Sequence, residues 1–261
     1  MKKYLGYIKK YKWRIVFALL VFQFFFPQYL KRAVYPYIYG QKTDEVLKIS
    51  QKDYFEDVNL SPFVVTKGKY TYKLNPKTIY AVTGRVGIVD HYDTLWKKFY
   101  RGQFQGKYMD LVPQDIFLVI GDMAHEDIFK KFKFEHEERL GRVLCKGVKY
   151  KKSFMSFTMS QEESRKNTEK LNECNQYIKQ SEENNYHPIP ATNRINKALS
   201  MLVPGDVVYL EGYLVDVPNM GLKTGTRKDQ YHENMIVSGR APGMCFILYT
   251  TKVVLNGRVY E

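Results

Sequence analysis

The sequence predicts a mainly β fold of the α+β class that follows one membrane-spanning helix. Three observations support this prediction: a single long uncharged run near the start, several segments in which apolar residues alternate with others, and two stretches of helical period between residues 160 and 202. The 261 residues, of which 44% are hydrophobic and 15% aromatic, suffice for one folded domain and exclude a disordered chain. The 17 glycines and 3 cysteines are too few for a collagen-like or disulfide-rich scaffold.

The N-terminal segment has the pattern of a signal-anchor. Residues 1–14 contain six cations and no anion, and residues 15–30 contain no charge. Sixteen helical residues span roughly 24 Å, slightly less than the ~30 Å hydrocarbon core, and flanking aromatic residues can lie at the interfaces. A cleaved signal peptide would need a small-residue cleavage site, and an interfacial helix would need a polar face, which is limited here to Gln23. We therefore predict a tail at 1–14 and a transmembrane helix at 15–30.

The distribution of cations orients this helix. Six cations precede the uncharged run and four follow it within about 20 residues, so the positive-inside rule places the N-terminal tail in the cytoplasm. We expect a single-pass protein of the inner (cytoplasmic) membrane with its C-terminal domain in the periplasm. An oxidising compartment allows one disulfide and one unpaired thiol, although three unpaired thiols fit the sequence equally well. The pairing is left open among Cys145, Cys174 and Cys245.

The pattern changes from a linker to strands near residue 59. Residues 31–58 are expected to form a linker with a short helix, because their apolar residues make only a loose face. Residues 63–74 have the pattern of a hairpin with a glycine turn. The alternation over 78–90 predicts a strand, which Gly84 and Gly87 allow to bend sharply.

The remaining elements follow from the same signals. The capping box from Ser160 to Glu163 opens a polar helix of about 20 residues, and Thr192 caps a second helix. The prolines around His187 break the pattern between these helices, and residues 91–114 are expected to form a long aromatic and basic loop. Strands are predicted at 115–122, within 123–158, at 207–217 and at 244–256, with a loop at 218–243.

The strand phrases resemble those of OB-fold barrels. The four phrases are Tyr80-x-Val82-x-Gly84-Arg85-Val86, Phe117-Leu118-Val119-Ile120-Gly121-Asp122, Gly205-Asp206-Val207-Val208-x-Leu210-x-Gly212-x-Leu214 and Lys252-Val253-Val254-Leu255. In OB folds a bent first strand with a central glycine comes before a central hairpin, and a Gly-Asp strand and a final strand close the barrel. The resemblance implies an OB-like β-barrel at 59–261 with a helical insertion at about 160–202.

The C-terminal part of the chain is similar to a second set of phrases. They are His187-Pro188-Ile189-Pro190, Pro204-Gly205-Asp206, Leu210-x-Gly212-Tyr213-Leu214-Val215 and Gly243-x-Cys245. They resemble a family of uncharacterised bacterial membrane-anchored proteins with an "N-N-H-x-I-P" segment and a "P-G-D-x-V-x-L-x-G-Y-L-V" strand. This chain departs from the pattern because Tyr186 separates Asn185 from His187. The resemblance implies an extracytoplasmic domain behind one anchor, and it implies no reaction.

The sequence contains no recognisable catalytic or metal motif. His125 and His232 are each followed by Glu but lack the second His of H-E-x-x-H, and the acidic residues around His136 would point to different faces. No G-x-S-x-G segment is present. We therefore expect no catalytic residue, no metal and no cofactor. His187 is expected to have a structural role, such as donating a ring N–H to a backbone carbonyl.

Aromatic and basic residues interleave in the predicted loop 91–110. This composition suits a surface that stacks bases and binds phosphates, a protein–protein interface, or plain packing of the barrel. We favour the protein interface and expect no nucleic acid, because an extracytoplasmic domain rarely meets single strands. The candidate interface residues are Tyr92, Trp96, Lys97, Phe99, Tyr100, Arg101, Phe104, Tyr108, Lys223 and Arg227.

These expectations combine into one predicted function and two alternatives. We expect a non-catalytic accessory or scaffold subunit of a membrane protein complex, whose partners are other subunits and, through residues 15–30, the lipid bilayer. The first alternative is an OB-type module that binds polyanions or single-stranded nucleic acid. The second alternative is a hydrolytic enzyme that uses His187 with a cysteine or a carboxylate. It requires a pocket in which a second titratable group lies within hydrogen-bond reach of His187.

Overall fold

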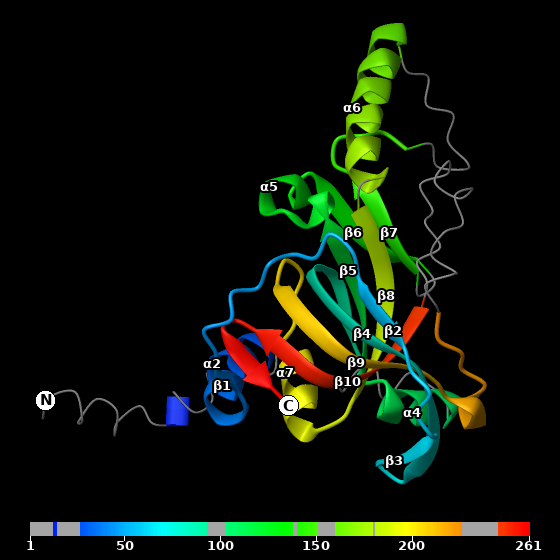
Figure 1. The fold of residues 1–261 in the computed structure, drawn as a ribbon. Coiled ribbons are helices and arrows are strands. Elements are labelled where there is room, and N and C mark those ends of the chain that lie inside the picture. The colour runs from blue at the N-terminus through cyan, green and yellow to red at the C-terminus, as the bar shows by residue number, and fades with distance from the viewer. Residues whose placement is uncertain are drawn as a thin grey trace, which may run out of the picture.

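The computed structural model describes residues 13–14, 27–92, 103–137, 140–150, 160–179, 181–225 and 245–261, which form a mainly β fold with several helices (Figure 1). The helices are α2 (Pro27–Tyr39), α4 (Gln103–Leu111), α5 (Glu126–Phe129), α6 (Gln161–Lys179) and α7 (Asn193–Leu199), with 3₁₀ turns η1 (Asp122–Ala124) and η2 (Pro218–Met220). The strands are β1 (Gln41–Lys42), β2 (Tyr54–Asp57), β3 (Phe63–Lys67), β4 (Tyr70–His91), β5 (Gln114–Gly121), β6 (Phe132–Glu137), β7 (Leu140–Cys145), β8 (Ser181–Pro190), β9 (Val207–Asp216), β10 (Cys245–Leu255) and β11 (Arg258–Tyr260).

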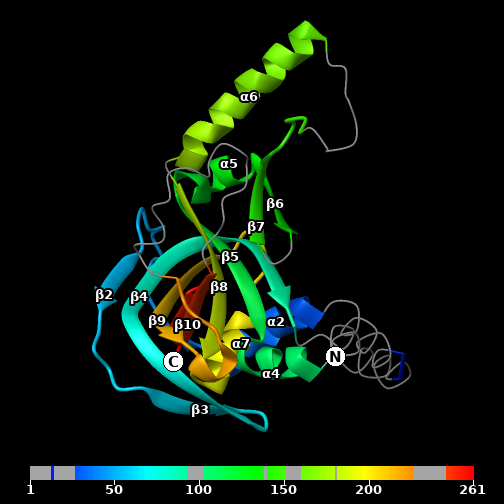
Figure 2. The same ribbon diagram turned by 90° about the vertical axis from the view of Figure 1, so that its right-hand side faces the viewer.

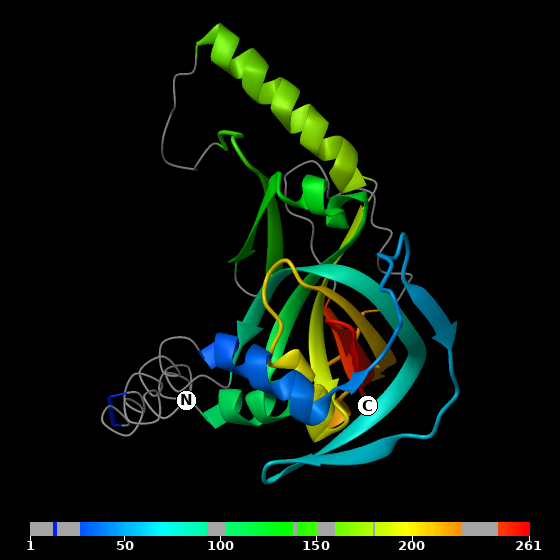
Figure 3. The ribbon, with the colours of Figure 1, turned by 90° about the vertical axis from the view of Figure 1, so that its left-hand side faces the viewer.

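Five of these strands pair in a closed circuit. β4 pairs with β5, β5 with β8, β8 with β10, β10 with β9, and β9 with β4. Of these five pairings, the one between β8 and β10 is parallel and the other four are antiparallel. β4 contains 22 residues and curves in a wide arc around the other strands, as Figures 2 and 3 show. The circuit is the framework on which the rest of the described chain is placed.

Two glycines make the circuit sterically feasible. The pairing of β4 with β5 changes register between Val86 and Ile88, so Gly87 lies at the irregularity where the predicted bend was expected. At Gly212 in β9, an added Cβ would lie 2.0 Å from the carbonyl oxygen of Tyr249, so the two strands can approach only because this residue has no side chain.

The core is divided between the inside and the outside of the circuit. The inner cluster consists of alternate residues of the five strands together with α7, which contributes Ile195, Ala198 and Leu199. Thr192 caps α7 as predicted, since its hydroxyl accepts a hydrogen bond from the amide of Ile195 at 3.2 Å. Because side chains alternate along a strand, the remaining residues point outward. They contribute to two further clusters, one of which joins Phe117 and Val119 of β5 to residues of β6, β7 and α6. The other is the outer cluster. Its buried members include Tyr72, Tyr92, Tyr108, Ile189 and Ile247.

The chain between β5 and β8 leaves the circuit. Its described residues form α5, β6, β7 and α6, and α6 extends away from the sheet (Figure 1). The capping box at the start of α6 is confirmed, because the amide of Glu163 donates to the Ser160 hydroxyl and the Ser160 amide donates to the Glu163 carboxylate, both at 3.2 Å. A disulfide between Cys145 and Cys174 joins β7 to α6. The third cysteine, Cys245, has a thiol that is not bridged.

Three sequence expectations need correction. Residues 91–114 include helix α4 instead of forming only a loop. The proline segment is not a break but the end of β8, so the predicted insertion at 160–202 is interrupted by a strand of the circuit. Proline has no N–H to donate to a neighbouring strand. Pro188 and Pro190 are tolerated there because the pairing with β5 ends at Tyr186, so no hydrogen bond to β5 is lost. Residues 31–58 contain most of α2 and two short strands.

The predicted transmembrane segment lies mostly outside the described residues, which include only its last four positions, 27–30. Those four residues form the first turn of α2. Within the ranges that the structure describes, none of the helices combines the length and the apolar character needed to cross a bilayer.

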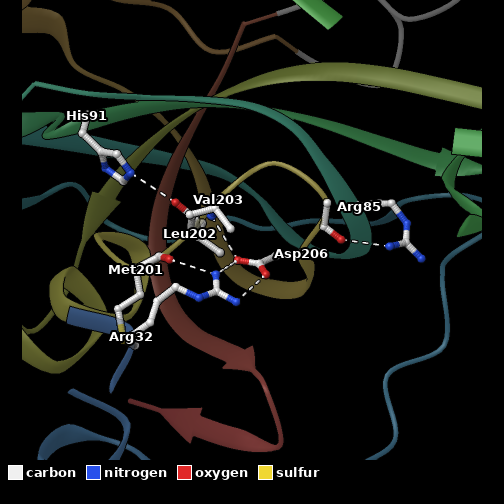
Figure 4. A network of polar contacts seen from close by, with 8 residues as sticks. Arg32, Arg85, His91, Met201, Leu202, Val203 and Asp206 are labelled. Carbon is white, nitrogen blue, oxygen red and sulfur yellow. Dashed lines mark hydrogen bonds and ion pairs between the residues drawn. The ribbon is translucent and has the colours of Figure 1, made fainter. Parts of the chain in front are cut away.

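An ion pair fastens α2 to the turn before β9 (Figure 4). The Arg32 guanidinium donates to both carboxylate oxygens of Asp206, at 2.5 and 2.9 Å, and to the carbonyl of Met201 at 3.2 Å. The Asp206 carboxylate also accepts the amide of Val203 at 3.0 Å. Figure 4 shows that Arg85 holds the same turn from β4, where its guanidinium donates to the Gly205 carbonyl at 2.8 Å. The turn is thus tied to both a helix and a strand.

We predict that breaking this ion pair destabilises the fold. The Asp206 side chain is only 9% exposed, so Arg32→Met leaves a nearly buried carboxylate without its main partner. We expect a loss of about 2 kcal/mol in the free energy of unfolding, measured by urea denaturation. The control is Lys130→Met, which breaks a fully solvent-exposed pair with Glu126 and should leave the urea midpoint unchanged. Equal midpoints for the two variants would contradict the prediction.

Candidate functional site

Three adjacent strands bring Asp115, His187 and Cys245 together. β8 is parallel to β10, so Asn185 lies opposite Cys245, and β8 is antiparallel to β5, so Asn185 also lies opposite Phe117. Residues two positions apart on a strand share a face of the sheet. His187 is therefore a diagonal neighbour of Cys245, and Asp115 lies beside His187. We call these three residues the Cys–His–Asp group.

The Cys–His–Asp group is on the outer face of the circuit. The residues that follow Asp115 and Cys245 and precede His187 point the other way, into the inner cluster, namely Ile116, Phe246 and Tyr186. Asp115 is 1% exposed and His187 is 7% exposed, whereas Cys245 is partly exposed. Cys245 is therefore the least buried residue of the group, and Asp115 is the most buried.

The His187 ring is held from one side by two oxygens. Its Nδ1 lies 2.5 Å from Oδ1 of Asp115 and 3.1 Å from the hydroxyl of Tyr108 in α4. The hydroxyl of Tyr92, just after β4, donates to the other carboxylate oxygen of Asp115. With both of its carboxylate oxygens engaged, Asp115 has a fixed orientation, which in turn orients the imidazole.

The backbone and the thiol of Cys245 are also held in place. The His187 ring is close enough to the thiol to lower its pKa, and the Asn185 side-chain amide lies 4.0 Å from Sγ. On the side away from β8, the amide of Gly225 donates to the Cys245 carbonyl at 3.0 Å. Two residues further along β10, the amide of Ile247 donates to the hydroxyl of Thr224 at 3.1 Å. The Cys245 sulfur is therefore carried by a strand that has hydrogen-bonding partners on both sides.

The electrostatics of the group favour a charged pair. Burial alone lowers the pKa of His187, but its hydrogen bonds to Asp115 and Cys245 outweigh burial and raise the pKa to about 9. Burial alone raises the pKa of Cys245, but the hydrogen bond and charge of His187, with the Asn185 amide, bring the pKa below its ordinary value. Both shifts stabilise a thiolate beside an imidazolium.

This arrangement contains the parts of an activated nucleophile. A cysteine becomes nucleophilic when an adjacent base takes its proton, and the base works best when a third group orients it. Here Cys245, His187 and Asp115 occupy these three positions. In the described ranges, no three His, Cys, Asp or Glu side chains are arranged so as to hold a metal ion.

The structure places only part of the predicted interface. Tyr92 and Tyr108 are buried, and their hydroxyls contact Asp115 and His187. Lys223 is exposed, and the backbone of Phe104 belongs to α4. The other predicted interface residues lie outside the described residues, namely Trp96, Lys97, Phe99, Tyr100, Arg101 and Arg227.

The sequence reasoning identified one member of the site and missed the others. For His187 it predicted a hydrogen bond to a backbone carbonyl, but the partners of the ring are the Asp115 carboxylate, the Tyr108 hydroxyl and the Cys245 thiol. The one available signal was that His187 and Cys245 both belong to the phrases of the second resemblance. No local pattern points to Asp115, since it opens an otherwise apolar strand.

Comparisons of the chain with models of protein families, with curated proteins and with solved structures each give no match.

We predict an acid-shifted reactivity profile for the Cys245 thiol. Without reductant the other two cysteines are joined, so iodoacetamide should label Cys245 alone. Because the His187 charge favours the thiolate, the alkylation rate should reach half its maximum at a pH below the ordinary thiol pKa of about 8.5. Asp115→Asn and His187→Gln should shift this midpoint upward, while His125→Gln, at an exposed histidine, should not. An ordinary midpoint in the unaltered chain would contradict an activated thiol.

We also predict a pH-dependent contribution of His187 to stability. A group whose pKa is raised on folding stabilises the fold fully below its unfolded value, about 6.5, and this stabilisation is lost as the pH rises through the raised value. The comparison is best made in a Cys245→Ser background, where the thiol cannot titrate but Asp115 still binds the ring. The difference in unfolding free energy between Cys245→Ser and Cys245→Ser/His187→Gln should be largest in mild acid and shrink in alkali. A difference that does not vary with pH would show that the imidazolium has no role in stability.

Proposed function

We propose that the chain is a cysteine-dependent hydrolase or acyltransferase in which Cys245 is the nucleophile, His187 the general acid and base, and Asp115 the group that orients His187. The observation that supports this proposal is the single His187 ring, which is hydrogen-bonded to the buried carboxylate of Asp115 on one neighbouring strand and lies beside the partly exposed Cys245 on the other. Strands position these side chains more rigidly than loops would, which favours a catalytic arrangement.

The proposed reaction passes through a thioester. The Cys245 thiolate attacks the acyl carbon of an ester, thioester or amide, and a carbon–sulfur bond forms. The His187 imidazolium gives its proton to the leaving oxygen, sulfur or nitrogen as the original acyl bond breaks. A water molecule or an acceptor then transfers a proton to the imidazole and attacks the thioester. The acyl group leaves, and the thiolate and imidazolium are restored.

Asn185 is placed to assist this chemistry. Its side-chain amide lies 4.0 Å from the Cys245 sulfur, and the residue is fully buried. An amide donor beside the nucleophile can hydrogen-bond the oxygen that becomes negative when sulfur attacks a carbonyl. We therefore assign to Asn185 the stabilisation of the thiolate before the attack and of the oxyanion after it.

The two tyrosines contact the carboxylate and the imidazole of the group. Tyr92 donates to Asp115, and the hydroxyl of Tyr108 lies next to Nδ1 of His187. They are positioning residues in this proposal, because they limit the rotation of the carboxylate and of the ring.

The fold and compartment are further parts of the proposal. We propose that the five-strand circuit is an OB-like barrel, which its bent first strand and the helix before the Gly-Asp strand support. We also propose an N-terminal anchor at 15–30 and a periplasmic domain, which the Cys145–Cys174 disulfide supports because such bonds persist in oxidising compartments. The accessory-subunit and polyanion-binding functions stay predictions, and the Cys–His–Asp group favours neither.

We predict that small activated esters acylate Cys245 and turn over. With p-nitrophenyl acetate, the intact-protein mass should show one acetyl group on Cys245, and release of p-nitrophenol should continue after the first equivalent. His187→Gln should lower turnover by roughly 10²-fold or more, because the activation of the Cys245 thiol and the activation of water are both lost. Asp115→Asn should lower it strongly, and Tyr92→Phe only several-fold.

Two controls separate catalysis from the reactivity of an exposed thiol. Cys245→Ser should abolish acylation, whereas His125→Gln should turn over at the rate of the unaltered chain, because His125 is exposed and outside the group. Acetylation of Cys245 that stops after one equivalent, and that is unchanged in His187→Gln, would contradict the proposal.

A further inference from the structure

The exposed face of α2 has the opposite polarity from that of an ordinary surface helix. Among residues 29–39 of α2, five are exposed and none of these is charged: Tyr29, Ala33, Val34, Tyr37 and Ile38. Tyr37 is 79% exposed and Ile38 is 64% exposed. On a helix Ala33, Val34, Tyr37 and Ile38 fall on one side, because residues three and four positions apart lie next to each other. A surface helix normally presents polar residues to water and apolar residues to the core.

The polar and packed residues of α2 are on its inner side. Arg32 is bound to Asp206, and Tyr35 and Tyr39 pack against the inner cluster. The ammonium of Lys197 lies 5.1 Å from the centre of the Tyr35 ring. The orientation of α2 is therefore fixed by the body of the protein, and rotation of the helix cannot bury Val34, Tyr37 or Ile38. Figure 3 shows α2 along the outside of the molecule.

We infer that this face of α2, which we call the α2 face and define as Ala33, Val34, Tyr37 and Ile38, lies on the surface of a lipid bilayer. An exposed apolar patch of this kind marks a contact with a protein or a membrane. The inference rests on the proposed membrane anchor but not on the proposed chemistry. It goes beyond the anchor because it concerns a helix of the folded domain and fixes how that domain faces the membrane.

Three observations favour lipid over a protein partner. The apolar run at 15–26 directly precedes α2 in the sequence, so an anchor there would keep α2 close to the bilayer. Tyrosine is enriched at membrane interfaces, where its ring is buried and its hydroxyl stays hydrated. The α2 face is also bordered by cations, since the Arg258 guanidinium lies 4.9 Å from the centre of the Tyr37 ring and Lys42 follows in β1. Such cations suit anionic headgroups.

The geometry predicts a shallow contact. Apolar side chains on one side of a short helix that is held by its other side can enter the headgroup region but cannot cross the bilayer. The domain would then rest on the membrane through α2 in one orientation, instead of hanging from a linker at residues 31–58.

The test is quenching of tryptophan fluorescence by brominated lipid. The full chain, with both native tryptophans changed by Trp13→Phe and Trp96→Phe, is reconstituted into phosphatidylcholine vesicles that contain a minority of phosphatidylglycerol. One protein also carries Ile38→Trp. The matched control carries Val64→Trp in β3, because Val64 is 63% exposed and belongs to a different part of the fold. The lipids are brominated on the acyl chain close to the headgroup.

The outcomes separate the inference from the anchor and from the chemistry. We expect Ile38→Trp to be quenched roughly twofold more than Val64→Trp, since its side chain lies at the interface. If both proteins float with the vesicles but are quenched equally, the anchor stands and the α2 contact is overturned. If Ile38→Trp fluoresces at shorter wavelength without being quenched, a protein or a second copy covers the α2 face, and the inference is again overturned. Failure of the chain to float with vesicles overturns the anchor itself, and with it this inference, while esterase turnover is unaffected.

Discussion

The parallel pairing of β8 with β10 is the constraint on which both the fold and the site depend. It closes the circuit of five strands, because β8 is otherwise joined only to β5 and β10 only to β9 and β11. It also places Asn185 opposite Cys245, although the two residues are 60 positions apart in the chain. A slip of one residue would turn Asn185 and His187 toward the inner cluster and Tyr186 toward the thiol. The apolar pattern of β8 and β10 therefore fixes the geometry of the polar group.

Burial of His187 with Asp115 is difficult to explain as a device for stability. Removing two charged groups from water costs several kcal/mol per ion, and an apolar pair of similar size is often at least as stabilising. The outer cluster around the group is rich in tyrosine, valine and isoleucine, so an apolar alternative would fit its surroundings. A charged pair beside a partly exposed thiol is explained if the charge takes part in the chemistry of the thiol. Raising the pKa of one group and lowering that of its neighbour is how proteins prepare a nucleophile and a proton donor near neutral pH.

The sequence predicted those helices and strands that are determined by patterns within a short segment of chain. The hairpin of β3 and β4, the buried strand β5, the capped helices α6 and α7, and the strands β9 and β10 were each visible as a period or a cap. β8 was missed because Pro188 and Pro190 are local signals of a break, and only the tertiary pairing shows that their missing N–H groups face no partner. Asp115 and Cys245, the partners of His187 in the site, were missed for a related reason. Asp115, His187 and Cys245 are unremarkable within their own segments and become a group only through the registers of three strands.

A continuous series of contacts joins α2 to the strand that holds the thiol. Arg32 binds Asp206, which immediately precedes β9, and β9 pairs with β10 from Leu214 and Leu248 to Val208 and Leu255. Paired strands of this kind can shift only by whole registers, so the position of one strand fixes the position of its neighbour. The position of Cys245 relative to α2, and so relative to any surface that contacts α2, is therefore fixed by the fold. The folded structure then determines how the Cys245 thiol is oriented relative to that surface. This orientation does not require residues 40–58 to move.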